Sequence, residues 1–206
     1  VTVITGGASG IGEACCRKFK DEGAKAVVVV DCDAEGAQRV ADAIGGVAMA
    51  ADVAVEDDIV RVVRDTEAQF GPIDLFFSNA GILVIDPSHV ASSSNEDWQR
   101  IWQINVMAHI YAARALLPGM LERGDGYLVS TASAAGLLSQ IGSAPYSVTK
   151  HAAVGFAESL SIMHGDQGIK VSVLCPQAVL TGMTRNIEGG GVAGVDGMLQ
   201  ADDVAD

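Results

Sequence analysis

The sequence lacks the cysteine and histidine patterns that mark metal-binding and disulfide-rich domains. Its four cysteines, Cys15, Cys16, Cys32 and Cys175, show no C-x-x-C or Cys/His spacing of the kind that zinc sites use. A chain of 206 residues is long enough to bury a substantial core without a disulfide framework. We therefore expect no metal site, and we interpret the cysteines as thiols of a cytoplasmic protein. The histidines form no H-E-x-x-H motif and are interpreted as surface or packing residues: His89, His109, His151 and His164.

The sequence also lacks long apolar segments and an excess of positive charge. Its longest apolar stretches, such as residues 26–30, fall far short of the roughly 18 residues that a membrane span needs. The N-terminus shows neither the basic segment nor the apolar run of a secretory signal. The formal net charge of -13 disfavours nucleic acids and anionic lipid, because both attract positive charge. We therefore expect small molecules and other proteins as partners, with no nucleic acid and no membrane.

Apolar, β-branched runs alternate with amphipathic segments along the chain. The runs predict six strands, at residues 1–5, 26–31, 47–50, 73–77, 126–130 and 170–175. The amphipathic segments predict five helices, at residues 10–22, 34–44, 56–70, 96–121 and 146–164. Near-continuous apolar strands separated by helices are typical of a parallel sheet covered on both faces. The predicted fold class is α/β, a doubly wound parallel sheet (Rossmann fold) with three layers, α/β/α.

No internal repeat or low-complexity linker divides the chain, so we predict one domain over residues 1–206. Pro118 lies inside the fourth helical segment, where we expect it to kink or restart the helix. The glycine-rich residues 188–197 predict a mobile loop. Residues 199–206 begin an acidic helix and then the sequence stops, which we interpret as a truncated C-terminus.

A glycine-rich turn follows the first predicted strand. The segment Thr5-Gly-Gly-Ala-Ser-Gly-Ile-Gly12 leads directly into the first helix. Gly6 permits a tight turn, Gly10 lets the main chain approach a pyrophosphate, and Gly12 lets the helix lie close to the sheet. The helix N-terminus adds free N–H groups and the positive end of a dipole. This order of strand, loop and helix indicates a dinucleotide site, and the alternative is a purely structural turn.

Asp31 ends the second predicted strand, where its carboxylate can accept hydrogen bonds from the ribose hydroxyls of an adenosine. The same charge would repel a 2'-phosphate, and neither Ser9 nor Cys32 nor Asp33 offers a cation to hold that phosphate. The sequence therefore predicts NAD rather than NADP as cofactor. The alternative is that Asp31 only caps a helix.

Tyr146 and Lys150 are four residues apart, so a helix places them on the same face. The phenol of a tyrosine has an unperturbed pKa of about 10, and a fixed positive charge beside it favours the phenolate. The pair can therefore act as a proton-transfer device in which Lys150 lowers the pKa of Tyr146. Taken alone, the same spacing also arises by chance on a solvated helix face.

Together these motifs resemble the short-chain dehydrogenases/reductases over nearly the whole chain. The resemblance rests on the glycine-rich turn, on Asp52-Val53 after the third predicted strand and on Asn79-Ala-Gly81 after the fourth. One departure is Gln177, which stands where the family usually has Gly and puts the local backbone conformation in question. The family's seventh strand and closing segment also have no counterpart before the last residue.

The resemblance implies a set of site residues. The implied catalytic residues are Asn105, Ser133, Tyr146 and Lys150. The implied cofactor-binding residues are Gly6, Ser9, Gly10, Ile11, Gly12, Asp31, Asp52, Val53, Asn79, Ala80, Gly81, Tyr146, Lys150, Pro176, Val179 and Thr181. In this set the Asp52 carboxylate would meet the adenine, and Val179 and Thr181 would contact the nicotinamide carboxamide.

The activity that the resemblance implies is NAD-dependent hydride transfer between a secondary alcohol, or its ketone, and nicotinamide. Tyr146 is expected to remove the hydroxyl proton as hydride leaves the carbinol carbon for nicotinamide C4, while Ser133 hydrogen-bonds the reacting oxygen. The charge of Lys150, with the oxidised nicotinamide nearby, is expected to lower the pKa of Tyr146 toward the working pH, and its ammonium is expected to donate to the nicotinamide ribose. Asn105 is expected to position a water that connects Lys150 to solvent.

Two other functions stay open: a non-catalytic NAD-binding sensor or scaffold, and a protein that works as an NADH-dependent carbonyl reductase. Apolar residues near the expected substrate side predict a hydrophobic alcohol or ketone. They are Ile82, Leu83, Leu137, Leu138, Val179, Leu180 and Met183. Residues 182–197 are expected to form a lid over the substrate. The two longest predicted helices resemble those through which the family dimerises, so we expect a homodimer or homotetramer.

Overall fold

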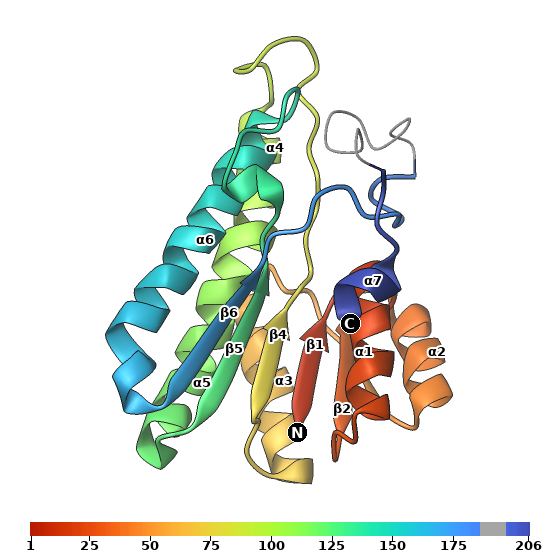
Figure 1. Cartoon of the computed structure of the whole chain (residues 1–206), viewed down its shortest axis with the longest axis vertical. Helices are drawn as coiled ribbons and strands as arrows, with labels where there is room; N and C mark the ends of the chain where they lie inside the picture. The colour runs from red at the N-terminus through yellow and green to blue at the C-terminus, as the bar shows by residue number, and fades with distance from the viewer. Residues whose placement is uncertain (186–196) are drawn as a thin grey trace.

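The computed structural model describes residues 1–185 and 197–206, which form a three-layer α/β/α arrangement (Figure 1). Six parallel strands make one sheet in the order β3-β2-β1-β4-β5-β6. They are β1 (Thr2–Thr5), β2 (Val27–Asp31), β3 (Val47–Ala50), β4 (Leu75–Ser78), β5 (Gly126–Thr131) and β6 (Ile169–Leu174). This is the strand order of a doubly wound dinucleotide-binding sheet, so the predicted fold class is confirmed.

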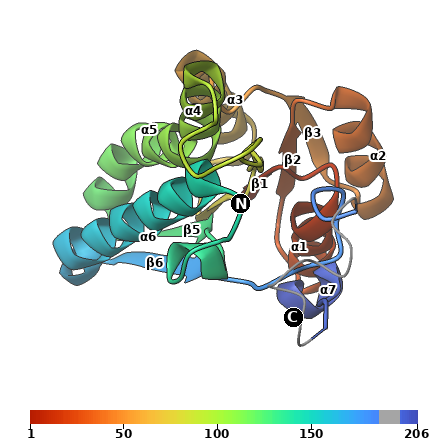
Figure 2. The ribbon, with the colours of Figure 1, turned by 90° about the horizontal axis from the view of Figure 1, so that it is seen from above.

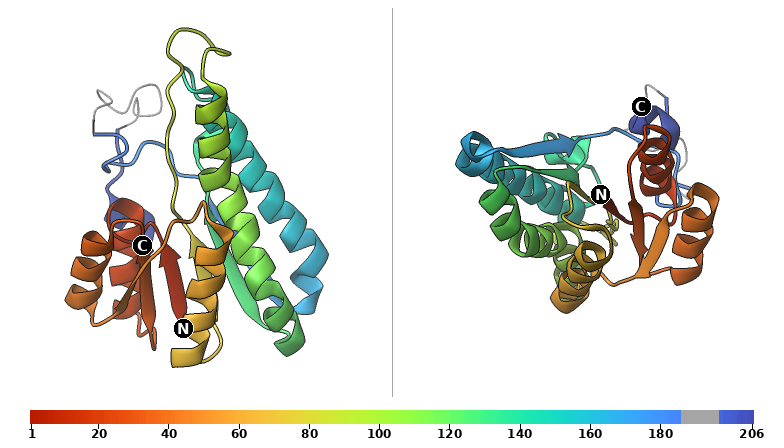
Figure 3. Two further views of the ribbon diagram at one scale, coloured as in Figure 1. Left: turned by 180° about the vertical axis from the view of Figure 1, so that it is seen from behind. Right: turned by 90° about the horizontal axis from the view of Figure 1, so that it is seen from below.

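Helices cover both faces of the sheet (Figure 2). On one face, over β1 and β2, lie α1 (Gly10–Asp21), α2 (Ala34–Ile44) and α7 (Ala201–Ala205). On the other lie α3 (Glu56–Phe70), α5 (Ala108–Arg123) and α6 (Ala144–His164), which Figure 3 shows side by side across the back of the sheet. In the described part of the chain, no helix is long and apolar enough to cross a membrane.

The central strands are buried on both faces, which explains their continuous apolar runs. In β2, Val28 and Val30 pack toward α3 and α5, whereas Val27 and Val29 pack toward α1 and α2. All four valines are fully buried. The sheet therefore separates two hydrophobic clusters, and its edge at the carboxyl ends of the strands is left for loops.

The expected single helix over residues 96–121 is wrong. The segment divides into α4 (Asn95–Trp102), one turn of π-helix (Gln103–Met107) and α5. At the end of the π turn, the Ala108 N–H donates to the carbonyl of Gln103, five residues back. Such π turns are rare and are often found at functional sites. Asn105 lies in this turn.

Of the kink or restart expected at Pro118, the restart is not found, because α5 continues through the proline to Arg123. A proline removes one main-chain hydrogen bond and favours a kink or a break. Here the buried side chains of Leu116 and Met120, on either side of the proline, anchor both parts of the helix in the same core. Tertiary packing therefore outweighs the local preference.

The carboxyl ends of all six strands lie along one edge of the sheet, and crossovers to opposite faces leave from β1 and β4. A sheet of this kind opens a crevice between two such strands, where ligands bind. The glycine-rich turn leaves β1 at this point, and the segment with Asn79 leaves β4 beside it. The fold thus brings the predicted motifs to one edge.

Candidate active site

A cavity of about 800 Å³ lies at the carboxyl edge of the sheet and collects most of the predicted site residues. Those that line it are Gly6, Ser9, Gly10, Ile11, Asp31, Asp52, Val53, Asn79, Ala80, Gly81, Ser133, Tyr146, Lys150, Pro176, Val179 and Thr181. Gly12 and Asn105 do not line the cavity, and both are buried. One wall of the cavity therefore carries the glycine-rich turn, and another carries the implied catalytic residues.

The glycine-rich turn follows a path that only glycine permits. Gly6 and Gly10 have φ angles of +66° and +53°, a region that residues with a side chain rarely adopt. A Cβ atom on Gly12 would lie 2.0 Å from the carbonyl oxygen of Gly6. Helix α1 begins at Gly10, so its free N–H groups lie at the cavity wall. The turn therefore fits a bound pyrophosphate group.

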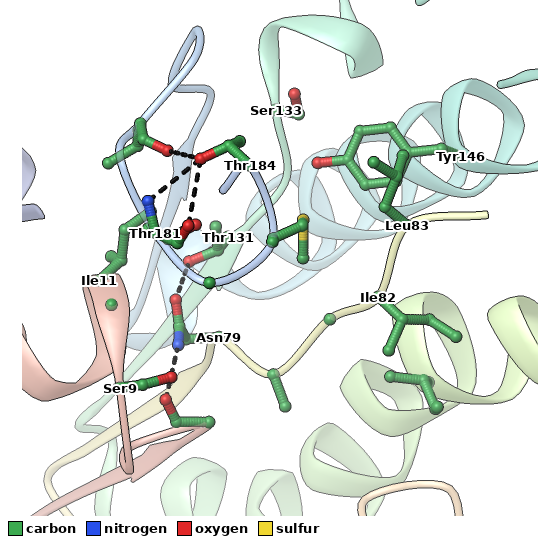
Figure 4. Close-up of a pocket in the computed structure, with 18 of the residues that line it drawn as sticks. Ser9, Ile11, Asn79, Ile82, Leu83, Thr131, Ser133, Tyr146, Thr181 and Thr184 are labelled. Carbon is green, nitrogen blue, oxygen red and sulfur yellow. Dashed lines mark hydrogen bonds between the residues drawn. The ribbon is translucent and has the colours of Figure 1, made fainter. Parts of the chain in front are cut away.

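Asn79 ties the glycine-rich turn to the catalytic side of the cavity (Figure 4). Its Nδ2 donates to the carbonyl of Thr5 at 3.0 Å, and its main-chain N–H donates to the Thr5 hydroxyl at 3.0 Å. The Thr131 hydroxyl donates to Oδ1 of Asn79 at 2.9 Å, and Nζ of Lys150 donates to the Thr131 carbonyl at 2.8 Å. Thr131 is missing from the predicted site, although a polar residue ending a buried apolar strand is a signal for such a role.

Asp31 does not cap a helix. The carboxylate of Asp33 caps α2 instead, by accepting from the N–H of Gly36 at 3.0 Å. Asp31 lines the cavity and orders the main chain around it, accepting from the N–H of Ala8 at 3.1 Å and of Asp33 at 3.0 Å. Its carboxylate therefore links the end of β2 to the glycine-rich turn.

An arginine near this end of the cavity is already engaged. Arg39 donates to the carbonyl of Ala8 at 2.7 Å and forms an ion pair with Glu13 at 2.8 Å. Hydrogen bonds from Arg39 and Arg17 lower the pKa of Glu13 to about 2, against the opposing effect of burial. The guanidinium therefore braces the glycine-rich turn and α1, and it shares the Glu13 carboxylate with Arg17.

Tyr146 and Ser133 face each other across the catalytic end of the cavity, and Leu83 lies beside the Tyr146 ring (Figure 4). Burial raises the pKa of Tyr146, and the Ser133 hydroxyl acts in the opposite direction. Nζ of Lys150 lies 5.5 Å from the centre of the Tyr146 ring. The expected lowering of the Tyr146 pKa is therefore not found in the chain alone, because desolvation of the phenolate dominates.

Lys150 is almost completely buried, with 2% of its surface exposed. Burial lowers the pKa of its ammonium group to about 8, with Cys175 acting in the opposite direction. This excludes the solvated helix face as an explanation of the pair. A buried amine with a pKa near neutrality can exchange a proton with little cost at working pH.

Asn105 joins the segment after β4 to α6. Its Oδ1 accepts from the N–H of Ile82 at 2.9 Å, and its Nδ2 donates to the Ile82 carbonyl at 2.9 Å and to the Thr149 hydroxyl at 3.3 Å. Both ends of the amide are therefore used inside the protein. No role for Thr149 is predicted from the sequence, although a hydroxyl next to a buried lysine could have suggested one.

Four of the seven apolar residues expected on the substrate side line the cavity. Ile82, Leu83, Val179 and Met183 line the cavity, whereas Leu137, Leu138 and Leu180 do not line it and are exposed. Gln177 also lines it, and no residue other than glycine has a positive φ in the described structure. Glutamine at this position therefore causes no backbone strain. Most of the predicted mobile loop and lid lies outside the described residues.

The chain resembles known proteins over most of its length. Residues 1–190 match the sequence model of the family described as short chain dehydrogenase. The meso-2,3-butanediol dehydrogenase of Serratia marcescens is 34% identical over 188 residues, which cover 90% of this chain and 73% of that protein. Secoisolariciresinol dehydrogenase of Forsythia intermedia is 33% identical over 196 residues, which cover 92% of this chain and 69% of that protein.

Two solved structures have the same fold and were determined with nicotinamide cofactors. The 3-ketoacyl-(acyl-carrier-protein) reductase of Brucella melitensis, complexed with NADH, matches with a TM-score of 0.91 and 32% identity, covering 99% of this chain and 86% of that one. A short chain dehydrogenase/reductase of Burkholderia phymatum, in complex with NAD, matches with a TM-score of 0.90 and 29% identity, covering 99% and 82%.

Proposed function

The chain belongs to the short-chain dehydrogenase/reductase family as an oxidoreductase of alcohols and ketones, and we propose that it uses NAD with Tyr146 as general acid and base. The observation that carries the proposal is the single cavity that joins the glycine-rich turn to Ser133, Tyr146 and Lys150. The glycine-rich turn alone, or the group of Ser133, Tyr146 and Lys150 alone, could have a purely structural role. A dinucleotide cradle and a proton-transfer pair at the two ends of one cavity together fit hydride transfer.

The chain's own residues handle the proton and the reacting oxygen. The cofactor supplies the hydride acceptor or donor when it is bound. Ser133 hydrogen-bonds the reacting oxygen from one side, and the Tyr146 hydroxyl takes or gives the proton from the other. Because burial keeps Tyr146 in its phenol form in the chain alone, it is ready to donate a proton to a ketone. For alcohol oxidation it must lose that proton first, which the nearby Lys150 ammonium favours.

NAD is favoured over NADP by the charge at the end of β2. Asp31 lines the cavity, and its carboxylate suits the two ribose hydroxyls while repelling a 2'-phosphate. Arg39, the cation described near this carboxylate, is paired with Glu13. The residues that would hold the rest of the cofactor are Gly6, Gly10, Ile11, Asp52, Val53, Asn79, Lys150, Val179 and Thr181.

The substrate that fits best is a secondary alcohol or ketone on a largely hydrophobic skeleton. Ile82, Leu83, Val179 and Met183 give the cavity an apolar wall next to Tyr146. An apolar wall contributes affinity by burial of the skeleton, whereas Ser133 and Tyr146 fix the position of its single oxygen. The substrate oxygen is therefore the group that Ser133 and Tyr146 recognise beside the cofactor.

We also propose that residues 1–206 act as one catalytic domain of a cytoplasmic homodimer or homotetramer. A single sheet carries both the cofactor side and the catalytic side, which supports one domain. Exposed apolar side chains on α4 and α6, including Trp102, Val148, Ile162 and Met163, support burial of these helices against another subunit. Sedimentation would give the number of subunits.

The experiment that tests the function is a panel of secondary alcohols with NAD, and of the matching ketones with NADH, followed by NADH absorbance. Tyr146→Phe keeps the ring but removes the proton donor and acceptor, so it should lower kcat between about 100-fold and 10,000-fold. Cofactor affinity, measured by fluorescence, should change less than about threefold, because the ring stays in place.

The outcomes separate the alternatives. NAD binding without turnover on any alcohol or ketone would support a sensor or scaffold. Turnover that is efficient only from the ketone side would support a carbonyl reductase. Activity of Tyr146→Phe within about threefold of the unsubstituted enzyme would remove Tyr146 from the chemistry.

A further inference from the structure

One apolar wall of the active-site cavity is a segment without regular secondary structure. Residues 82–86 follow β4, and within this segment Ile82, Leu83 and Ile85 line the cavity. Figure 4 shows Leu83 beside the ring of Tyr146. Within the described chain, the main chain of Leu83 and of Ile85 makes no hydrogen bond that would hold it in place. The position of this wall is therefore fixed at the two ends of the segment.

Asn105 holds the first end. Its side-chain amide accepts from the N–H of Ile82 and donates to the carbonyl of Ile82, each at 2.9 Å. Asn105 is fully buried in the π turn before α5. This end of the segment is therefore anchored to the helices behind the sheet.

Asp86 holds the second end. Its Oδ2 accepts from the N–H of Ala144 at 2.9 Å, and its Oδ1 accepts from the hydroxyl of Ser93 at 2.9 Å. Its main-chain N–H donates to the carbonyl of Gly142 at 2.9 Å. One residue thus joins the wall to the loop before α6, to the first residue of α6 and to the segment before α4.

Helix α6 has no cap from its own sequence. Ser143 stands directly before the helix, where a serine hydroxyl commonly accepts from a free N–H of the first turn. Here the Ser143 side chain makes no such bond and, fully buried, donates to the carbonyl of Val84 instead. The Asp86 carboxylate takes the N–H of Ala144, at the positive end of the helix dipole. The wall segment therefore supplies the cap of the helix.

Tyr146 lies in the turn of α6 that this cap stabilises, two residues after Ala144. The same carboxylate thus ends the wall segment and fixes the start of the helix that carries the proposed proton donor. The distance between Leu83 and Tyr146 therefore depends on Asp86. A wall held close to the reacting oxygen limits which skeletons can bind in a productive position.

We propose that Asp86 is a positioning residue, which holds the apolar wall of the cavity against Tyr146 and so determines the size of the skeleton that binds productively. Asp86 is not among the described residues that line the cavity, so it acts through Leu83, Ile85 and Tyr146. The kinetic consequence rests on the proposed function. The structural consequence, displacement of the wall when the carboxylate is removed, is measured without a substrate.

The structural test uses NMR of protein labelled at the leucine methyl groups, with Leu83 assigned by its loss in Leu83→Met. The unsubstituted protein should show a nuclear Overhauser effect between the Leu83 methyls and the Tyr146 ring. Asp86→Ala should weaken this effect at least about twofold and speed hydrogen exchange of the Ala144 amide at least about tenfold. Asp86→Asn keeps an oxygen for Ala144 and a polar group for Ser93, so it should retain both signals.

The kinetic test compares two secondary alcohols that share a methyl carbinol and differ in size, isopropanol and methyl cyclohexyl carbinol. In Asp86→Ala, kcat/KM for the larger alcohol should fall about tenfold, mainly through KM, because its ring loses contact with the wall. For isopropanol the change should stay below about threefold, since this alcohol reaches little of the wall. Asp86→Asn should restore the ratio between the two alcohols.

Ser94→Ala is the matched control. The Ser94 hydroxyl caps α4 by accepting from the N–H of Asp97 at 3.0 Å, so the substitution removes a helix cap close to Ser93 without touching the bonds of Asp86. It should lower the midpoint of denaturant unfolding about as much as Asp86→Ala does. The ratio of kcat/KM between the two alcohols should stay unchanged, which separates positioning from a general loss of stability.

Two results would overturn the proposal. One is an Asp86→Ala protein in which the contact of Leu83 with Tyr146 and the exchange of the Ala144 amide are unchanged. The other is an equal loss of kcat/KM on both alcohols. If Asp86→Ala does not fold, Asp86→Glu keeps the carboxylate but lengthens it by one methylene, and an unchanged alcohol ratio in that variant would also overturn it. If neither alcohol is turned over, the proposed function fails, and the NMR measurements still decide the role of Asp86.

Discussion

The two ends of the active-site cavity differ in whether main chain or side chains form their surface. At the end near α1, the main chain itself forms the surface, with Gly6, Gly10 and Gly12 allowing a path that side chains would block. At the other end, buried polar side chains form the surface, and Asn105 and Lys150 are at most 2% exposed. The first end depends on local backbone conformation, and the second on burial by distant parts of the chain. Substitutions at the two ends should therefore differ in their effects on stability, cofactor affinity and activity.

The largest expected effect tests the main-chain end. Gly12→Ala puts a Cβ atom 2.0 Å from the Gly6 carbonyl oxygen, so the turn or α1 must move. We expect a loss of about 3 kcal/mol in the free energy of unfolding and at least about 100-fold in NAD affinity. Denaturant unfolding and NAD titration measure both effects.

Gly155→Ala is the control for this substitution. Gly155 lies inside α6 and a Cβ atom there would meet nothing within 4 Å. The variant should be more stable by about 0.5–1 kcal/mol, because alanine favours the helix. Equal effects at Gly12 and Gly155 would mean that close approach of the main chain is not what the glycine-rich turn requires.

The second prediction concerns the end of the cavity that holds the buried charge of Lys150. Here we expect the substitution to raise the free energy of unfolding instead of lowering it. Lys150→Met should abolish activity yet stabilise the fold at neutral pH. Lowering the pKa of Lys150 from 10.5 to about 8 corresponds to about 3 kcal/mol against the folded state. The substitution also leaves the Thr131 carbonyl without its donor, which destabilises the folded state by about 1 kcal/mol. The net gain should be about 2 kcal/mol in denaturant unfolding.

The pH dependence of this gain follows from linkage. Below pH 8 the lysine is charged in both the folded and the unfolded state, so burial of the charge destabilises the unsubstituted protein by the full amount. Between pH 8 and 10.5 the folded lysine loses its proton while the unfolded one keeps it, so the wild-type chain becomes more stable as pH rises. The advantage of Lys150→Met should shrink over this interval, and a constant advantage would contradict burial of the charge as its cause.

The third and smallest effect separates charge from shape at Asp31. Asp31→Asn keeps an oxygen that can accept from the N–H of Ala8, but it removes the negative charge. The ratio of kcat/KM with NAD to that with NADP should fall about tenfold, because one charge-assisted preference is lost. Asp31→Ala removes the contact as well and should also lower stability. An unchanged cofactor ratio in both variants would move the discrimination elsewhere.

The sequence predicts the features that depend on local signals and misses those that depend on packing between distant parts of the chain. The six strands and the path of the glycine-rich turn were predictable, because apolar runs and glycine positions are local signals. The π turn at Asn105 and the uninterrupted α5 at Pro118 were not. Both are results of packing against β4, β5 and α6, which overrides local preference.

In the active site, too, the sequence does not predict effects that depend on burial or on contacts between distant elements. The structure places Lys150 beside Tyr146, as the sequence predicts, but the burial that raises the Tyr146 pKa in the chain alone was not predictable. A sequence shows which charges are close along a helix, and it does not show how deeply they are buried. The roles of Thr131 and Thr149 were missed for the same reason, because their partners come from other elements.

A chain of hydrogen bonds described above joins the two ends of the cavity through one side chain. The Asn79 amide holds the Thr5 carbonyl with its nitrogen and receives the Thr131 hydroxyl with its oxygen, and Thr131 in turn receives Lys150. Exchanging the two ends of that amide would place its oxygen against the Thr5 carbonyl, which has no hydrogen to donate, whereas the Thr131 hydroxyl could still accept from the amide nitrogen. The Asn79 amide therefore couples the path of the glycine-rich turn to the position of Lys150.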